Sequence, residues 1–155
     1  VVIVRNAAQR ERRIPIDEFY LLPGQTPHLE HDLAADEMIV AVELPLTPAL
    51  RHSHYLKVRD RSSYEFAAAS AAVGIELDGD RIRDLRIAVG GVATKPWRAR
   101  HVEGALRGQP FDEAILRRAA ELVVQDAELL PQNQHKKLLA PRAIARALMK
   151  AGGMA

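Results

Sequence analysis

The sequence predicts an α+β fold in which a small antiparallel sheet is followed along the chain by helices. Apolar and polar residues alternate with a period of two through most of residues 54–92, which is typical of half-buried strands. Asp78-Gly79 interrupts this pattern and is a strong signal for a hairpin turn. After Thr94 the apolar period changes to nearly four, which indicates helices.

Composition places the chain among globular proteins. Its 155 residues are 48% apolar and 27% charged, and no apolar run approaches the about 20 residues that span a bilayer. The formal charge of +2 is spread among interspersed charges, so we expect no nucleic-acid binding. With no cysteine, the chain contains no disulfide, no cysteine nucleophile and no cysteine ligand for an iron–sulfur cluster.

The first region, residues 1–45, predicts short strands joined by loops. VVIVRN begins without Met and has the pattern of a strand already under way, so we expect the chain to be part of a longer protein. Pro15, Pro23 and Pro27 exclude a long helix, and so few strands can hardly bury a core alone. The prolines of LPLTPALRHS mark a boundary near residues 45–52.

The second region predicts a three-stranded meander over His54–Asp60, Ala67–Leu77 and Arg81–Val92. In the middle strand one face carries only small residues apart from Glu76, namely Ala68, Ser70, Ala72 and Gly74. Small residues in a strand indicate close packing. Either a helix lies on this face, or a partner domain or ligand covers it.

Three helices follow: one from a Thr94 cap with Pro96 in its first turn to Leu106, one after an Asp112 cap, and one from Gln134 to Lys150. Pro141 removes a backbone donor from the third helix. We therefore expect a kink or a fresh start at that residue.

Few motifs in the chain carry chemistry. His28 and His31, and His52 and His54, form two close pairs without further metal ligands at a usual spacing, so solvated histidines are the better interpretation. GxSxG, HExxH and a Gly-rich phosphate loop do not occur. The glycine pair in VGGVA, residues 89–93, favours a bulge or a close backbone approach over phosphate binding.

The first strand of the second region presents a cationic face. Tyr55, Lys57 and Arg59 point to one side of an extended chain. A cation there can neutralise an anionic cofactor edge or a phosphate. The alternative is a solvated face in which these cations pair with Asp60 or Glu65.

Three stretches carry a resemblance to a known family: RRIPIDEFYLLPG, then DEMIVAVELP, then the long run from SHYLKVRDRSSYEF to RGQPF. In this order they resemble the flavin-binding medium subunit of molybdenum hydroxylases, the group of xanthine dehydrogenase, CO dehydrogenase and aldehyde oxidoreductase. Within that group the chain is most similar to the FAD subunits of periplasmic-type aldehyde oxidoreductases.

The resemblance implies that residues 1–48 are the last strands of an FAD-binding domain. Residues 49–155 are then a CO dehydrogenase flavoprotein C-terminal-like domain, a three-stranded antiparallel sheet with three helices. It also implies two FAD-contacting residues. Ile39 matches the branched apolar residue of the family's E-[IL]-[IL]-x-x-[IV]-x-[IL]-P run, and Lys57 matches a lysine near the isoalloxazine ring. The Gly-rich segments that cradle the FAD pyrophosphate in the family are not in these residues.

By the same resemblance, the function is that of part of an oxidoreductase subunit. The molybdenum cofactor would be bound by a molybdopterin-binding large subunit, the clusters by a 2Fe-2S small subunit, and FAD would pass electrons to an acceptor. A different hypothesis is a non-catalytic docking module that assembles such subunits. Location in the cytoplasm, or in the periplasm by export with a partner, stays open.

Overall fold

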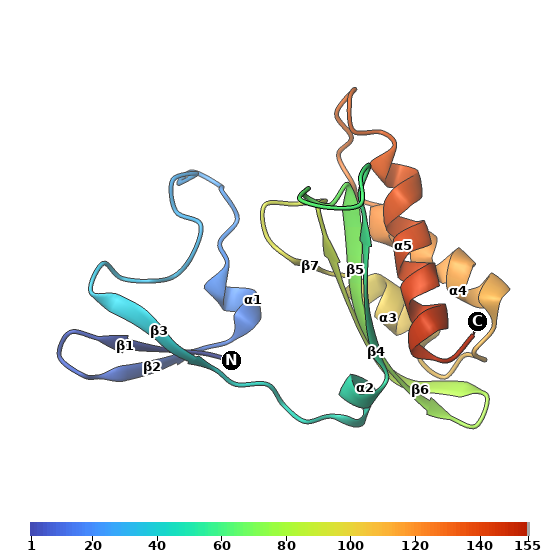
Figure 1. Cartoon of the computed structure of the whole chain (residues 1–155), viewed down its shortest axis with the longest axis horizontal. Helices are drawn as coiled ribbons and strands as arrows, with labels where there is room; N and C mark the ends of the chain where they lie inside the picture. The colour runs from blue at the N-terminus through green and yellow to red at the C-terminus, as the bar shows by residue number, and fades with distance from the viewer. Residues whose placement is uncertain (155) are drawn as a thin grey trace. The chain divides into compact units, whose positions relative to one another are not determined.

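The computed structural model describes residues 1–154 and divides into two compact units, Val1–Leu46 and Thr47–Ala155. In the first unit three short strands form an antiparallel sheet in the order β2-β1-β3 (Figure 1). Its elements are β1 (Val2–Asn6), β2 (Glu11–Ile14), the single-turn helix α1 (Ile16–Phe19) and β3 (Glu37–Val42).

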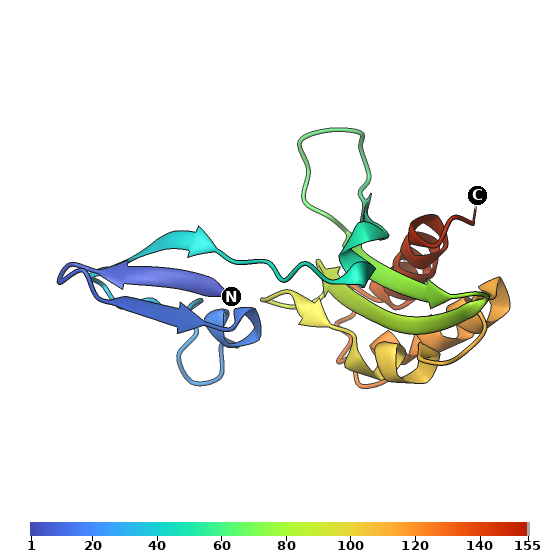
Figure 2. The same cartoon turned by 90° about the horizontal axis from the view of Figure 1, so that it is seen from below.

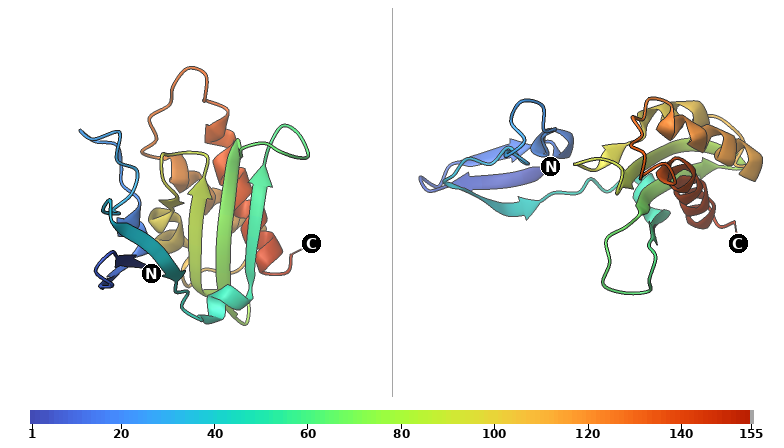
Figure 3. Two further views of the ribbon diagram at one scale, coloured as in Figure 1. Left: turned by 60° about the vertical axis from the view of Figure 1, so that its left-hand side comes forward. Right: turned by 90° about the horizontal axis from the view of Figure 1, so that it is seen from above.

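The second unit is a four-stranded antiparallel sheet in the order β4-β5-β6-β7, covered on one face by helices (Figures 1 and 3). Its strands are β4 (Ser53–Val58), β5 (Ala69–Asp78), β6 (Arg81–Gly90) and β7 (Trp97–Arg98). Its helices are α2 (Pro48–Arg51), α3 (Arg100–Leu106), α4 (Glu113–Ala120), the 3-10 helix η1 (Glu121–Val124) and α5 (Lys136–Ala151).

The core of the second unit lies between the two long strands and α5. The turn at Gly79, with φ of +60°, sets Val73 opposite Ile87 and Ile75 opposite Leu85. These side chains are buried against Ile144, Leu148 and their neighbours on α5. The predicted α+β class is therefore confirmed, with β7 as a short addition to the expected three strands.

The sequence prediction was wrong about residues 94–98, where it placed the start of a helix. Trp97 and Arg98 instead pair with Val89 and Ala88 of β6, and the helix begins only at Arg100. Glu103 explains the difference, because its buried carboxylate accepts a hydrogen bond from the Arg98 side chain and so holds β7 against the sheet. This ion pair, together with the pairing of β7 to β6, outweighs the local preference of Thr94 and Pro96 for a helix start.

The third predicted helix needs a smaller correction. α5 continues through Pro141 as one element, so the helix does not restart there. The Pro141 side chain is fully buried, and its packing offsets the backbone hydrogen bond that a proline cannot donate. Asp112 caps α4 as predicted, with its side chain accepting a hydrogen bond from the Ile115 N–H at 3.1 Å.

Candidate functional site

The cationic face predicted for β4 exists, but it is shorter than expected. β4 ends at Val58, so Arg59 lies outside the strand and does not share its face. Tyr55 and Lys57 are exposed, while Leu56 and Val58 are half-buried and pack against the core. Lys57 makes no hydrogen bond or ion pair with the residues from 1 to 154, so the alternative, in which it pairs with Asp60 or Glu65, does not hold for this residue.

A shallow groove of about 430 Å³ runs beside β4 and gathers more cations around Lys57. Arg59 and Arg61 line it from the following loop, and Arg146 lines it from α5. Asp60 is the acidic residue among its lining side chains. Arg146 was not predicted as part of this surface, because nothing in the sequence indicates that α5 packs beside β4.

The loop from residue 59 to 68 stands out from the sheet (drawn in green in Figures 2 and 3). The Glu65 carboxylate accepts a hydrogen bond from the Arg61 N–H at 2.9 Å, and the Arg61 guanidinium donates to the Tyr64 carbonyl. Tyr64 and Phe66 are 94% and 96% exposed. The loop thus presents two aromatic rings beside the cationic groove.

The small-residue face of β5 is covered only in part. At Gly74 the single-turn helix α2 approaches so closely that a Cβ atom would lie 2.7 Å from the Ala49 carbonyl oxygen. Ala72 on the same face is exposed and lines a hollow of about 360 Å³ with Tyr55 and Arg86. The sequence left two interpretations of this face, a covering helix or a partner domain or ligand. A helix covers the face at Gly74, and the face at Ala72 is left uncovered.

The glycine pair of VGGVA serves close backbone approach, as predicted. A Cβ atom at Gly90 would lie 2.5 Å from the Ser70 hydroxyl oxygen. Gly91 has φ of +74°, and a Cβ atom there would lie 2.8 Å from the Ala67 carbonyl oxygen. Both positions exclude a side chain, and Gly91 also has a backbone conformation that favours glycine.

A second polar centre, which the sequence did not indicate, surrounds Glu103 in α3. This residue is only 3% exposed, and its carboxylate accepts a hydrogen bond from the Ile87 N–H at 2.8 Å. The Arg98 guanidinium also donates to this carboxylate, with a distance of 3.0 Å between Arg98 Nη2 and Glu103 Oε2. A buried carboxylate that is fully paired in this way joins α3, β6 and β7, and its role is structural.

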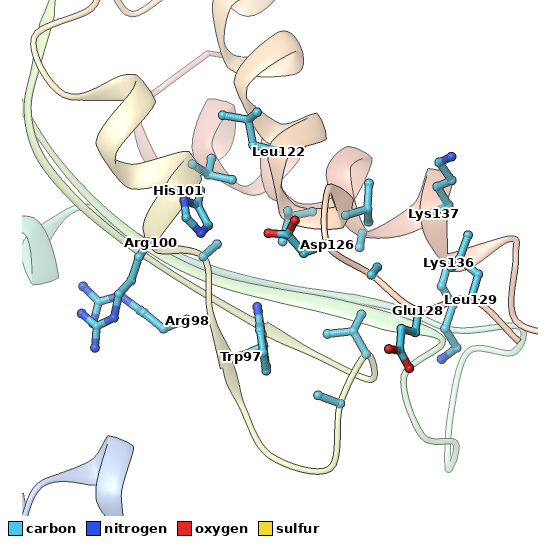
Figure 4. A pocket seen from close by; sticks show the side chains of 18 of the residues that line it. Trp97, Arg98, Arg100, His101, Leu122, Asp126, Glu128, Leu129, Lys136 and Lys137 are labelled. Atoms are coloured by element: carbon cyan, nitrogen blue, oxygen red, sulfur yellow. The ribbon is translucent and has the colours of Figure 1, made fainter. Parts of the chain in front are cut away.

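A pocket of about 280 Å³ opens beside Arg98, the ion-pair partner of Glu103, between β7 and the start of α5 (Figure 4). Trp97 and Leu129 contribute apolar surface, and His101, Asp126 and Lys136 contribute polar groups. The pocket therefore mixes apolar and charged walls. Figure 4 shows the neighbouring side chains of Lys136 and Lys137 leaving α5 in different directions.

Ile39, the second predicted site residue, lies on β3 in the first unit. It is opposite Val4 of β1 and 44% exposed, so its side chain is available for contact. Glu37 holds the start of β3 through hydrogen bonds from the Arg12 guanidinium at 2.7 Å and the Ala34 N–H at 2.9 Å. These two donors hold the pKa of Glu37 below its usual range, with Arg12 the stronger cause.

Two features are absent from residues 1–154. Among them no group of three or more His, Cys, Asp or Glu side chains is arranged to hold a metal ion. No helix within that range has the length and apolar character needed to cross a membrane.

A known protein family matches most of the second unit. The CO dehydrogenase flavoprotein C-terminal domain matches residues 54–151. This range contains all but the first residue of β4, the strands β5 to β7 and the helices α3 to α5, and therefore Lys57 and the groove around it.

Two curated relatives extend the similarity to the first unit. The chain is 42% identical over 151 residues to the aldehyde oxidoreductase FAD-binding subunit PaoB of Escherichia coli (strain K12), a match that covers 94% of this chain and 42% of the relative. It is 28% identical to the glyceraldehyde dehydrogenase medium chain of Sulfolobus acidocaldarius, over 86% of this chain and 44% of the relative. The chain thus spans less than half the length of these relatives.

Solved structures show the same fold. Quinoline 2-oxidoreductase from Pseudomonas putida 86 matches 99% of this chain and 52% of its own, with a TM-score of 0.83 and 24% identity. CO dehydrogenase from Hydrogenophaga pseudoflava matches the same shares with a TM-score of 0.82 and 24% identity. At this identity the likeness concerns the fold.

Proposed function

Because the chain belongs to the CO dehydrogenase flavoprotein C-terminal domain family, we propose that it is part of the FAD subunit of a molybdenum-containing hydroxylase of the aldehyde oxidoreductase type. The observation that carries the proposal is the 42% identity to an aldehyde oxidoreductase FAD-binding subunit over 94% of the chain. In this proposal residues 1–48 belong to an FAD-binding domain and residues 49–155 form the C-terminal domain.

The proposal includes partners and a direction of electron flow. A molybdopterin-binding large subunit oxidises the substrate, and a small subunit with 2Fe-2S clusters passes the electrons on. FAD, when bound, supplies the redox chemistry that delivers them to an acceptor. The cysteine-free chain leaves cluster ligation to the partners or to parts of the subunit outside these residues.

The side chains of two residues fit an anionic, planar cofactor. Lys57 is exposed and offers an ammonium group that makes no ion pair with residues 1–154. Ile39 offers a branched apolar surface that is 44% exposed. We assign Ile39 to apolar contact with FAD and Lys57 to electrostatic stabilisation of the negative charge that reduction adds to the ring.

A positive charge about 4 Å from the developing negative charge contributes roughly 1 to 4 kcal/mol, depending on solvent exposure. For a two-electron couple this corresponds to about 20 to 90 mV. Lys57→Ala is therefore expected to lower the flavin reduction potential of the assembled complex by an amount in this range. A redox titration of the flavin absorption band measures it.

Lys150→Ala is a suitable control, because it removes an equal charge from an exposed position on α5. It is expected to leave the potential within about 10 mV, since solvent and salt screen a distant exposed charge. Equal shifts in the two variants would contradict a specific role for Lys57.

The alternative is the docking module, and one observation favours it. Met38, Val42, Leu44 and Leu46 are exposed apolar residues on and after β3, as in a surface that a partner covers. Under this alternative Lys57→Ala changes neither the flavin potential nor the rate of reoxidation. The visible absorption spectrum of the full-length protein with its co-purifying partners separates the two: flavin bands support the flavin subunit, and a colourless preparation supports the docking module.

A further inference from the structure

Lys136, the first residue of α5, joins two strand ends that are distant from it in sequence. Its ammonium group donates hydrogen bonds to the Ala68 carbonyl at 2.8 Å and to the Gly91 carbonyl at 2.6 Å. Ala68 directly precedes β5, and Gly91 directly follows β6. We call these three residues the lysine clamp.

The backbone around the clamp is built for this contact. Gly91 lies so close to the start of β5 that a Cβ atom would be 2.8 Å from the Ala67 carbonyl and 3.2 Å from the Ala68 carbonyl. With φ of +74° it also has the left-handed conformation that glycine tolerates best. Close approach at Gly91 and the reach of Lys136 therefore meet at one group, the Ala68 carbonyl.

The clamp is connected to Lys57 by a short path. The Ala68 N–H donates to the Val58 carbonyl at 2.9 Å and closes the loop that begins at Arg59. Val58 is the residue after Lys57 and the last residue of β4. Ala68 therefore links the two: its carbonyl accepts a hydrogen bond from Lys136, and its N–H donates to Val58, the neighbour of Lys57.

The loop has little else to fix it. Tyr64 and Phe66 are almost fully exposed, so the loop has no buried aromatic anchor. Its internal hydrogen bonds involve the side chains of Glu65 and Arg61, and both lie within the loop itself. The base of the loop is therefore the point at which the rest of the domain restrains it.

A lysine at this place in α5 needs an explanation. Cations in the first turn of a helix are disfavoured by the helix dipole, and the first turn of α5 contains Lys136 and Lys137 with no acidic residue. For Lys136, the hydrogen bonds to the Ala68 and Gly91 carbonyls offset this unfavourable interaction with the helix dipole. Lys137 is exposed and makes no side-chain hydrogen bond or ion pair with residues 1–154, so it is a natural internal control.

We propose that Lys136 is a positioning residue that holds the base of the 59–68 loop and, through Val58, the orientation of Lys57. This inference rests on the proposed function, in which Lys57 adjusts the flavin potential. Lys136 itself touches neither cofactor nor substrate. Its effect is mechanical, because it restricts the motion of the strand end from which Lys57 and the loop extend.

The test compares Lys136→Met with Lys137→Met in the assembled complex. Methionine keeps the unbranched stem of lysine and removes the charge and the donors, so both variants lose one charge at the start of α5. The first measurement is amide hydrogen exchange at Ala68 and Arg61. Since charge-assisted hydrogen bonds are lost, Lys136→Met is expected to speed exchange at these amides by about tenfold, and Lys137→Met by less than about twofold.

The second measurement is the flavin potential, with Lys57→Ala as the reference. Lys136→Met is expected to shift the potential in the same direction as Lys57→Ala, and Lys137→Met to leave it unchanged. Lys136→Arg keeps a cation with several N–H donors and is expected to restore most of the exchange protection. If Lys136→Met does not assemble, Lys136→Gln, which is also uncharged and has a shorter side chain, replaces it in both measurements.

Unchanged exchange in Lys136→Met would overturn the clamp. Faster exchange with an unchanged potential, where Lys57→Ala does shift it, would overturn the positioning role while the proposed function stands. A potential that does not respond to Lys57→Ala would overturn the proposed function, and the exchange measurement would still decide whether the clamp holds the loop.

Discussion

The two units of the chain differ in how completely they bury their own apolar residues. The second unit encloses a continuous core between β5, β6 and α5, in which Ile75, Leu85 and Ile144 are fully buried. The first unit buries Val2, Val4, Ile14 and Phe19 and leaves Leu46 98% exposed. Burial of apolar surface is the main source of folding stability, so the second unit has the means to hold its fold by itself and the first depends on further contacts.

Charge separates the units as well. Residues 1–46 contain 4 Lys and Arg against 8 Asp and Glu, whereas residues 47–155 contain 18 against 12. The near-neutral total of +2 therefore hides an acidic unit and a basic one. The total charge gave no sign of a concentrated basic surface. Four cations nevertheless line one groove in the folded chain, namely Lys57, Arg59, Arg61 and Arg146.

The largest effect is expected from a cavity in the core of the second unit. Ile144→Ala removes buried methyl groups from α5 and is expected to lower the free energy of unfolding by about 2 to 5 kcal/mol. Leu138→Ala, in the same helix at an exposed position, is expected to cost less than about 1 kcal/mol. Chemical denaturation measures both, and amide exchange in β1 to β3 is expected to stay the same. Faster exchange there would contradict separate cores.

A smaller effect is expected where α2 meets the sheet. Gly74→Ala places a Cβ atom 2.7 Å from the Ala49 carbonyl oxygen and is expected to cost about 1 to 3 kcal/mol, because backbone must move. Gly104→Ala is the matched control in α3, where a Cβ atom meets nothing within 4 Å. It is expected to stabilise by up to about 1 kcal/mol through helix propensity. Melting curves that move in the same direction for both variants would contradict this account.

The smallest effect concerns a paired carboxylate in the second unit. Burial acts to raise the pKa of Asp84, but hydrogen bonds from Arg86 and Arg107 outweigh it and hold the pKa below its usual range. A lowered pKa contributes stability above the unfolded-state value of about 3.9, and this contribution is lost as pH falls through the folded-state value. Asp84→Asn is expected to cost less than about 1 kcal/mol at pH 7, because the pair is partly exposed.

Denaturation at two pH values checks this prediction. At a pH below the folded-state pKa of Asp84, the native carboxyl group is itself neutral, so the difference between the native protein and Asp84→Asn is expected to disappear. A difference that persists unchanged at that pH would show that the asparagine acts through packing and not through charge.

Sequence patterns predicted the parts of the fold that depend on neighbouring residues. The hairpin at Gly79, the strands on either side of it and the Asp112 cap follow from local rules of turns, alternation and capping. The same rules failed at residues 94–98. There a buried carboxylate and a guanidinium several residues apart decide the structure, and no local period records such a pair.

The candidate site was predictable to a similar degree. Alternation on β4 was enough to identify Lys57 as exposed, and the family resemblance gave it a proposed role. Arg146 and Lys136 reach the β4–β5 region from α5, more than 60 residues further along the chain, where helical period alone shows only an exposed arginine and a lysine in a first turn. Tertiary packing decides which of these cations meet the site.

Within residues 1–154, β4 pairs with β5 on one side and with no strand on the other, so its outer edge is free. Exposed strand edges invite pairing between protein molecules and so lead to aggregation. Lys57 and Arg59 line the groove beside this edge, so a second molecule that approached through its own β4 edge would meet charge of the same sign. We therefore expect these cations to oppose edge-to-edge pairing at low salt, and less strongly as added salt shortens the range of the repulsion.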